Sequence, residues 1–183
     1  MKVAIYSRVL EQGQQKDIQI LFDELEQESI ISVVYETLFA ELKKFISLPS
    51  SCLTFSDHEE LNDDIDFVIS LGGDGTLLDT VTLIRNKNIP VVGINFGRLG
   101  FLASIGKDEV SSAVKALARR SYIMDKRSLI HVDANIPIFG DTPYALNEFA
   151  IHKQDVAPMI KIHTYLNGEL LNIYWADGLI LAT

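Results

Sequence analysis

The residues with the clearest chemical potential form a glycine-rich turn, Gly72-Gly73-Asp74-Gly75-Thr76, between an apolar run and a helical pattern. Glycine adopts backbone conformations that other residues avoid, so such a turn can direct several N–H groups toward a phosphate at a helix N-terminus. A carboxylate in the same turn would repel that phosphate. Asp74 therefore handles a metal ion, a hydroxyl proton or a ribose hydroxyl, or it merely caps the helix, and the residue pattern leaves both interpretations open.

The elements that must position this turn alternate between strand and helix. Short apolar runs predict strands at residues 2–6, 30–35, 51–55, 65–70 and 91–94. Helical spacing of apolar residues predicts helices at 14–28, 36–46, 76–86 and 107–119. This alternation predicts an α/β fold, in which a Rossmann-like, mostly parallel sheet carries helices on both faces.

The pattern changes after about residue 122. Strand-like runs without helical spacing occupy residues 129–134, 146–152, 160–166, 170–175 and 179–182. Asn167-Gly168 has the favoured composition of a two-residue hairpin loop, and Asp177-Gly178 on its own also resembles a hairpin turn. We therefore predict two domains, an α/β domain at 1–121 and an antiparallel β-rich domain at 122–183.

Composition restricts the environment and the partners. Of 183 residues, 48% are hydrophobic and the formal net charge is −9, so a broad nucleic-acid surface is not expected. Cys52 stands alone, the four histidines show no paired spacing for a structural zinc site, and neither a signal peptide nor a membrane span is apparent. We expect a cytoplasmic protein that binds any polyanion through backbone amides, helix N-termini and a divalent cation.

Four segments together resemble one family. The turn at 72–76 is similar to that of a kinase superfamily that includes NAD kinases, diacylglycerol and sphingosine kinases and 6-phosphofructokinases. Gly93–Leu102 (GINFGRLGFL), Asn147-Glu148 within ALNEFAIHK, and Tyr174–Thr183 (YWADGLILAT) are similar to NAD kinase segments, in the same order. The resemblance extends from about Leu71 to the last residue.

The resemblance implies roles for individual residues. Gly72, Gly73, Gly75 and Thr76 would shape the loop around the phosphates, and Asp74 would be the general base. Phe101 would lie near the adenine of NAD, and Asn147, Glu148 and Asp177 would contact NAD, the first two at its adenosine moiety. Without the resemblance, Phe101 could instead plug a domain junction. Asn147 or Glu148, each taken alone, could be a polar residue at the edge of a hairpin.

The implied reaction transfers the γ-phosphoryl group of ATP to the 2′-hydroxyl of the adenosine ribose of NAD, which gives NADP. The substrates would be NAD and ATP, with Mg²⁺ or Mn²⁺ carried by ATP, and the full-length protein would be a homo-oligomer, a dimer or tetramer. In the family a further segment follows the strand that ends here at Thr183. We therefore expect an incomplete β-sandwich domain and an N-terminal fragment with little or no kinase activity.

Three alternatives differ from this interpretation in the residues they require. A lipid kinase of the diacylglycerol type would keep the glycine turn but should lack the segments at Gly97–Leu102 and Asn147-Glu148. A non-catalytic nucleotide-binding module would keep the nucleoside contacts and bind NAD without turnover. A Rossmann-type dehydrogenase is less consistent, because its glycine fingerprint follows the first strand rather than a later one.

Overall fold

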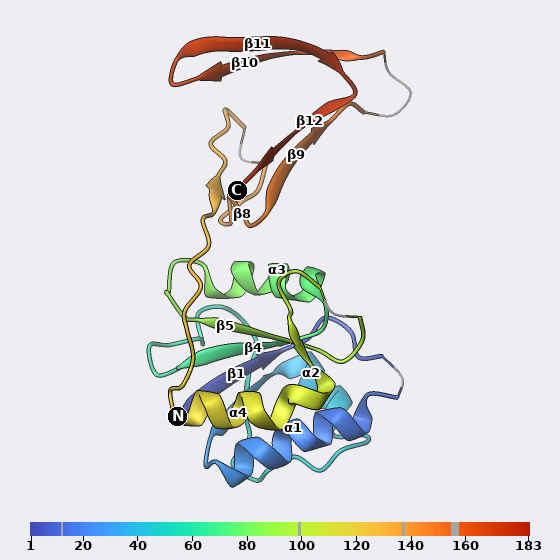
Figure 1. Cartoon of the computed structure of the whole chain (residues 1–183), viewed down its shortest axis with the longest axis vertical. Coiled ribbons are helices and arrows are strands. Elements are labelled where there is room, and N and C mark those ends of the chain that lie inside the picture. Colours follow the sequence, from blue (N-terminus) through green and yellow to red (C-terminus); the bar gives the residue numbers. More distant parts are fainter. Residues whose placement is uncertain (12, 99, 137, 155–157) are drawn as a thin grey trace. The chain divides into compact units, whose positions relative to one another are not determined.

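The computed structural model describes residues 1–11, 13–98, 100–136, 138–154 and 158–183, and it divides into two compact units. Unit 1 comprises Met1–Asp125 and unit 2 comprises Lys126–Thr183 (Figure 1). The boundary between the units lies between Asp125 and Lys126, whereas the sequence pattern predicts a boundary between residues 121 and 122. Among the described helices, none combines the length and the apolar character required to cross a bilayer.

Unit 1 contains a six-stranded sheet in the order β3-β2-β1-β4-β5-β6, and all of its strand pairs are parallel. The α/β prediction is therefore confirmed. Its strands are β1 (Lys2–Tyr6), β2 (Ile31–Tyr35), β3 (Leu53–Phe55), β4 (Phe67–Leu71), β5 (Val91–Asn95) and β6 (Ile105–Gly106). The helices are α1 (Gln15–Gln27), α2 (Glu36–Leu42), α3 (Asp74–Ile84) and α4 (Val110–Ala118), with a 3-10 turn, η1, at Lys107–Glu109.

Apolar side chains on both faces of the inner strands explain why helices cover both faces. In β1, Val3 and Ile5 join one buried cluster, and Ala4, which points the other way, joins a second. The first cluster contains the inward faces of α1, α2 and α4, and the second contains the loop before β4 and partly buried side chains of α3. All five residues of β4 are buried, as expected of a strand covered on both sides.

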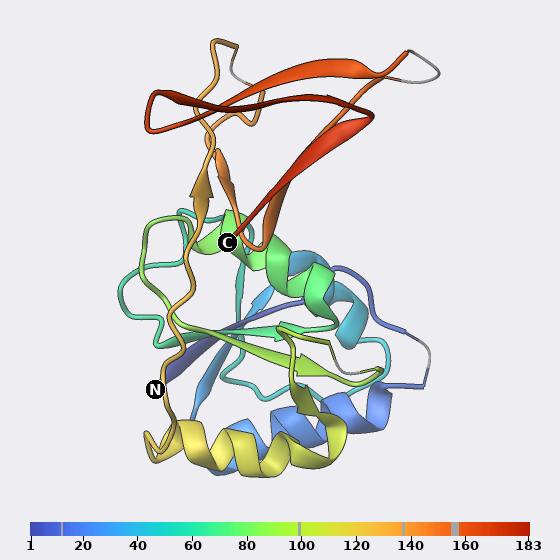
Figure 2. The ribbon, with the colours of Figure 1, turned by 45° about the horizontal axis from the view of Figure 1, so that its top comes forward.

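The order of the strands reverses its direction between β1 and β4. From β1 the chain passes to β2 and β3 on one side, and β4, β5 and β6 continue on the other (Figure 2). The loops that leave the carboxyl ends of β1 and β4 therefore diverge. In open α/β sheets, ligands bind at such a switch point, so the residues after Tyr6 and after Leu71 stand where a ligand is expected.

Unit 2 contains only β-strands among its regular elements. Its pairs are antiparallel: β7 (Ile130–His131) with β8 (Tyr144–Ala145), β9 (Glu148–His152) with β12 (Gly178–Ala182), and β10 (Ile160–Leu166) with β11 (Glu169–Ala176). Asn167 and Gly168 join β10 to β11 with φ values of 53° and 89°. Positive φ at both positions is what a two-residue hairpin turn requires, so this turn is confirmed.

Several predicted details are wrong or incomplete. The strands β6 and β8 were missed, because each is two residues long and shows no periodicity. Asp177-Gly178 is not a hairpin turn, since β11 pairs with β10 and β12 pairs with β9. Helix α3 begins at Asp74 rather than Thr76, which places the acid inside the first helical turn.

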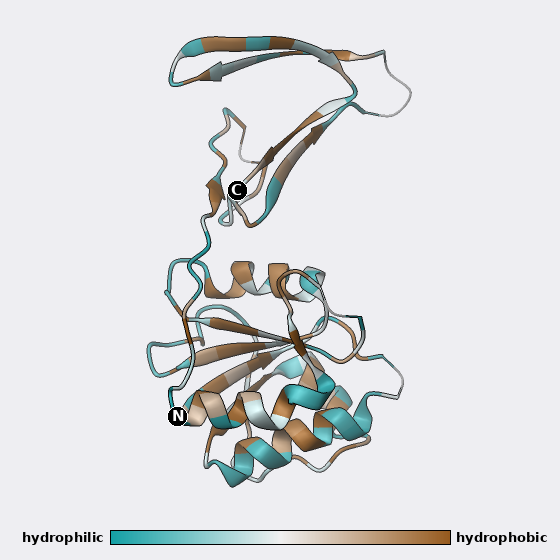
Figure 3. Cartoon of the chain, in the orientation of Figure 1, coloured by the Kyte–Doolittle hydropathy of each residue, from teal (hydrophilic) through white to brown (hydrophobic). Residues whose placement is uncertain are grey.

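The hydrophobic core belongs to unit 1. All buried hydrophobic residues found in the described ranges lie between Val3 and Leu117, and none of the described residues of unit 2 is buried. The inner strands of unit 1 are mostly brown, the colour of hydrophobic residues, whereas the strands of unit 2 carry both brown and teal segments (Figure 3). On β11, Trp175 is 65% exposed and Leu171 is 59% exposed. Unit 1 thus has the buried core that independent folding requires.

We expect residues 1–125 alone to fold and to unfold cooperatively, because the buried clusters lie within them. Thermal and urea unfolding followed by circular dichroism would test this. Leu21→Ala in the same fragment removes a fully buried side chain and should lower the free energy of unfolding by about 2–5 kcal/mol. A broad, non-cooperative transition in the unsubstituted fragment would contradict the expectation.

Candidate functional site

The glycine turn connects the end of β4 at Leu71 to the start of α3 at Asp74. Gly72 has a φ of +146°, and a Cβ at this position would lie 2.5 Å from Oγ1 of Thr76. Only glycine satisfies both conditions, so Gly72 is required for the turn to close onto Thr76. Gly73 is the N-cap of α3, and its carbonyl accepts hydrogen bonds from the N–H groups of Thr76 and Leu77.

The first N–H groups of α3 remain available to a ligand. No described residue accepts a hydrogen bond from the N–H of Gly73, Asp74 or Gly75, and no side chain caps the helix. A helix N-terminus leaves such donors open and carries partial positive charge. At the carboxyl end of an inner strand, these N–H groups form the kind of surface that binds phosphate.

The Asp74 carboxylate binds a segment that follows β5. Its Oδ2 accepts a hydrogen bond from the N–H of Phe101 (2.8 Å), and its Oδ1 accepts from the N–H groups of Leu102 and Ala103 (2.9 Å each). Three consecutive backbone donors thus converge on one side chain. The interpretation that Asp74 caps its own helix is therefore wrong. Its carboxylate accepts hydrogen bonds from residues 101–103 instead of from the N-terminus of α3.

These hydrogen bonds also set the charge state. Those from the backbone of Ala103, and then of Leu102 and Phe101, lower the pKa of Asp74 below its ordinary value, although partial burial opposes them. The carboxylate is therefore ionised at neutral pH. A carboxyl group with a lowered pKa is a weaker base than an ordinary aspartate, which bears directly on its chemical role.

Gly100 makes this arrangement sterically possible. A Cβ at Gly100 would lie 2.2 Å from Oδ1 of Asp74, well inside any real contact. The chain must therefore pass against the carboxylate with no side chain before it can present the next three N–H groups. Sequence reasoning noted the glycines of this segment but did not identify Gly100 as the partner of Asp74. Leu99, in the same motif, lies outside the described residues.

Asn95 is a second polar group at this edge, and sequence reasoning assigned it no role. It is 7% exposed and ends β5. Its Nδ2 donates to the carbonyl of Arg98 (2.6 Å), and its Oδ1 accepts from the N–H of Gly97 (2.9 Å). The side chain therefore fixes the start of the loop that ends on Asp74. The position of an asparagine at the end of a buried strand was the sequence signal that could have identified Asn95.

The backbone of Phe101 is held in place, whereas its side chain is exposed. Its N–H is bound to Asp74, whereas its side chain is 96% exposed and joins neither buried cluster of unit 1. An exposed aromatic ring on a loop held by hydrogen bonds is suited to packing against a flat ligand.

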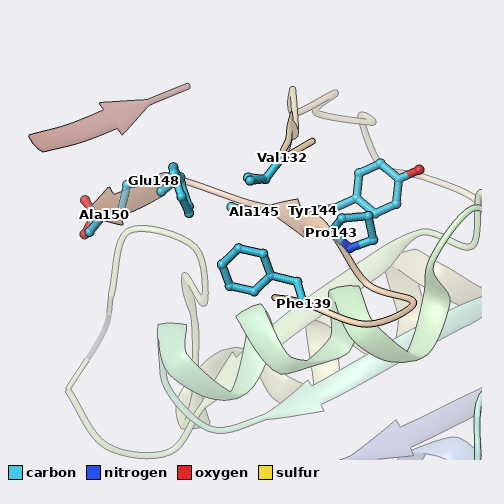
Figure 4. A pocket seen from close by; sticks show the side chains of 8 residues that line it. Val132, Phe139, Pro143, Tyr144, Ala145, Glu148 and Ala150 are labelled. Carbon is cyan, nitrogen blue, oxygen red and sulfur yellow. The ribbon is translucent and has the colours of Figure 1, made fainter. Parts of the chain in front are cut away.

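The other predicted nucleoside residues lie in unit 2. Asn147 precedes β9 with a φ of +75°, and its carbonyl accepts from the N–H of Thr183 (2.9 Å). The expectation that Asn147 and Glu148 are neighbours within one strand is wrong, because β9 begins at Glu148. Glu148 lines a mainly apolar cavity of about 240 Å³ together with Val132, Phe139, Pro143, Tyr144, Ala145, Phe149 and Ala150 (Figure 4).

Asp177 lies at the bend between β11 and β12. Its Oδ1 forms a 2.7 Å ion pair with Nζ of Lys153, and its carbonyl accepts from the N–H of the same lysine (2.9 Å). Asp177 is thus held by a cation in its own unit. Within the described ranges, no group of three or more His, Cys, Asp or Glu side chains is arranged to hold a metal ion.

Comparison with known proteins connects this geometry to one family. Residues 10–122 match the family described as ATP-NAD kinase N-terminal domain. The whole chain aligns with NAD kinases of Cytophaga hutchinsonii (41% identity, 63% of that protein) and Bacteroides fragilis (38%, 62%). The fold matches yeast NADH kinase complexed with NADH, with a TM-score of 0.81 and 21% identity over 99% of this chain and 57% of that one. The chain thus spans less than two thirds of these relatives.

We expect Gly100→Ala to destabilise unit 1 and Gly75→Ala not to do so. A Cβ at Gly100 would overlap Asp74, whereas a Cβ at Gly75 has no atom within 4 Å and sits in a helix that favours alanine. Thermal unfolding of the two variants would compare them. Equal midpoints would mean that the contact between Gly100 and Asp74 contributes nothing to stability.

The lowered pKa of Asp74 predicts a pH-dependent contribution to stability. A group whose folded pKa is depressed stabilises above its unfolded pKa, about 4, and the stabilisation is lost as the pH falls through the folded value. Asp74→Asn should therefore lower the free energy of unfolding by about 1–3 kcal/mol at pH 7, and by progressively less below pH 4. Urea unfolding between pH 7 and pH 3 measures the difference, and a constant difference would contradict the assignment.

Proposed function

The chain belongs to the NAD kinase family, and from that premise we propose that the protein transfers the γ-phosphoryl group of ATP to the 2′-hydroxyl of the adenosine ribose of NAD. The observation that carries the proposal is the glycine turn at the switch point of the sheet. It offers three N–H groups without acceptors among the described residues, next to an ionised carboxylate. Phosphoryl transfer needs this combination of positioning and charge.

The turn would receive the phosphates of the donor. The N–H groups of Gly73, Asp74 and Gly75 supply hydrogen-bond donors, and α3 supplies the positive end of its dipole. Gly72 lets the turn close against Thr76, so these donors would be in place before ATP arrives. ATP would enter as its Mg²⁺ or Mn²⁺ complex, and the cation would neutralise charge on the phosphates.

Asp74 would accept a hydrogen bond, and finally the proton, from the 2′-hydroxyl of NAD. A carboxylate offers about four acceptor positions, two on each oxygen. Among the described residues, Oδ1 accepts two backbone hydrogen bonds and Oδ2 accepts one. Oδ2 would therefore accept the hydrogen bond from the hydroxyl group. Since the lowered pKa makes Asp74 a weak base, proton transfer belongs late in the reaction, when the hydroxyl oxygen has become acidic.

Four residues would bind NAD. The exposed ring of Phe101 would pack against the adenine, Asn147 and Glu148 would contact polar groups of the adenosine, and Asp177 would contact NAD. The cavity beside Glu148 supports this, because apolar walls with few polar groups are typical of small-molecule sites. The ion pair with Lys153 supports a fixed orientation of the Asp177 side chain.

We propose a cytoplasmic homo-oligomer, and the exposed apolar side chains of β10, β11 and β12 support an association through unit 2. Light scattering of the full-length protein at several concentrations would measure its mass.

A non-catalytic NAD-binding module remains the second candidate. It is favoured by the same three hydrogen bonds, because a carboxylate that anchors residues 101–103 has a structural role that needs no reaction. Such a module would bind NAD and ATP and form no NADP.

Asp74→Asn should reduce kcat of NADP formation by about 100-fold or more in the full-length protein, with a smaller change in KM, because the proton acceptor is lost. Asp63→Asn is the matched control, since Asp63 is an exposed acid in the loop before β4 and the substitution changes the charge equally. NADP formed from NAD, ATP and Mg²⁺ is the readout. A kcat of Asp74→Asn within twofold of that of the unsubstituted protein would contradict the assignment of Asp74 as the base. If the unsubstituted protein bound NAD and ATP but formed no NADP, the non-catalytic module would be favoured.

A further inference from the structure

The loop after β1 carries polar side chains at the same switch point as the glycine turn. Strand β1 ends at Tyr6 and pairs with β4, in the register Tyr6 to Ser70. Ser7 and Arg8 therefore leave the sheet beside Leu71, the residue that leads into Gly72. No motif in the sequence pointed to these two positions.

Ser7 ties this loop to the glycine turn. The serine is 5% exposed, and its hydroxyl donates to the carbonyl of Leu71 at 2.7 Å. That carbonyl belongs to the last residue of β4, immediately before the turn. The position of Arg8 relative to the turn is thus set by a buried hydrogen bond rather than by a free loop.

Arg8 is then bound to the helix that follows the turn. Its Nε donates to Oδ2 of Asp79 (2.7 Å), and its Nη2 donates to Oδ1 of the same residue (2.5 Å). Asp79 lies in the second turn of α3, five residues after Asp74. The two-point geometry fixes the plane of the guanidinium, as a single contact would not.

The fixed guanidinium still has donors to offer. An arginine side chain carries five N–H donors, and Asp79 occupies two of them. The Arg8 side chain is 63% exposed, so the remaining donors are open to solvent and to a ligand. The Asp79 side chain is only 23% exposed, and its negative charge helps raise the pKa of Tyr6, after burial of the phenol. Asp79 thus anchors the guanidinium of Arg8, and Arg8 is the more solvent-exposed of the two side chains.

The negative charges on α3 explain why a cationic side chain is needed beside the glycine turn. The protein has a net charge of −9, and both Asp74 and Asp79 lie on the first two turns of α3. A triphosphate that approaches these acids is repelled unless a nearby cation offsets them. An arginine held in one plane is well matched to phosphate oxygens, which it can bind with two parallel hydrogen bonds.

We propose that Arg8 binds the polyphosphate chain of the phosphoryl donor and that Asp79 positions its guanidinium. The inference rests on the proposed function and adds to it a side chain from the loop after β1. Arg8 thereby contributes affinity for the donor, whereas NAD is bound by other residues.

The test compares Arg8→Ala, Arg8→Lys and Asp79→Asn in the full-length protein. Calorimetry measures the Kd of MgATP, of inorganic tripolyphosphate and of NAD, and kinetics measure KM for each substrate. Arg119→Ala is the matched control, because it removes one exposed cation at the C-cap of α4, which belongs neither to the glycine turn nor to the loop after β1. Surface ion pairs add little to stability, so each variant should fold, which circular dichroism verifies.

Arg8→Ala should raise the Kd of MgATP and of tripolyphosphate by about tenfold or more and leave that of NAD unchanged. Arg8→Lys should lie in between, because lysine keeps the charge without the planar fork, and Asp79→Asn should raise KM for ATP more than it lowers kcat. Unchanged donor affinity in Arg8→Ala, or an equal loss in Arg119→Ala, overturns the proposal.

The two hypotheses fail separately. If the unsubstituted protein forms NADP and Arg8→Ala binds MgATP normally, the inference is wrong and the kinase assignment stands. If no NADP forms but tripolyphosphate binding depends on Arg8, the inference stands and the kinase assignment is wrong. If the unsubstituted protein binds neither MgATP nor tripolyphosphate, both are wrong.

Discussion

The arrangement of the candidate site in unit 1 centres on one interaction, the convergence of three backbone N–H groups on the carboxylate of Asp74. It joins the first turn of α3 to residues 101–103, which lie 27 to 29 positions further along the chain. Gly100 must lack a side chain for this contact to form, and Phe101 is oriented by it. A charged acceptor for three neutral donors is a strong arrangement, because each hydrogen bond is charge-assisted.

The same interaction limits the chemistry of Asp74. By stabilising the ionised form, the backbone keeps the carboxylate negative and makes it a poor acceptor of protons in the ground state. An acid of this kind suits a reaction in which the proton leaves late. It also raises the local negative charge at the N-terminus of α3, and in the proposed function backbone amides together with the anchored Arg8 would offset that charge without a broadly basic surface.

The two units differ in how their strands are stabilised. The inner strands of unit 1 are covered by helices and packed side chains, so its loops rest on a rigid core, as a site that must hold atoms in place requires. The strands of unit 2 have no buried residue in the described ranges and expose Leu171 and Trp175. Glu148 and Asp177 are therefore positioned by strand pairing and by the ion pair with Lys153 rather than by a packed interior.

The sequence by itself determined the elements whose signals are local. Apolar and strand-like runs predicted β1 and β10 with their observed bounds, Asn167-Gly168 predicted its hairpin, and the glycine turn was placed correctly between a strand and a helix. Only the tertiary structure decided the partner of Asp74, the bond between Arg8 and Asp79, 71 residues apart, and the division of β11 and β12 between different sheets. These depend on contacts between distant segments, and the side-chain types nearby in the sequence carry no information about which distant backbone will meet them.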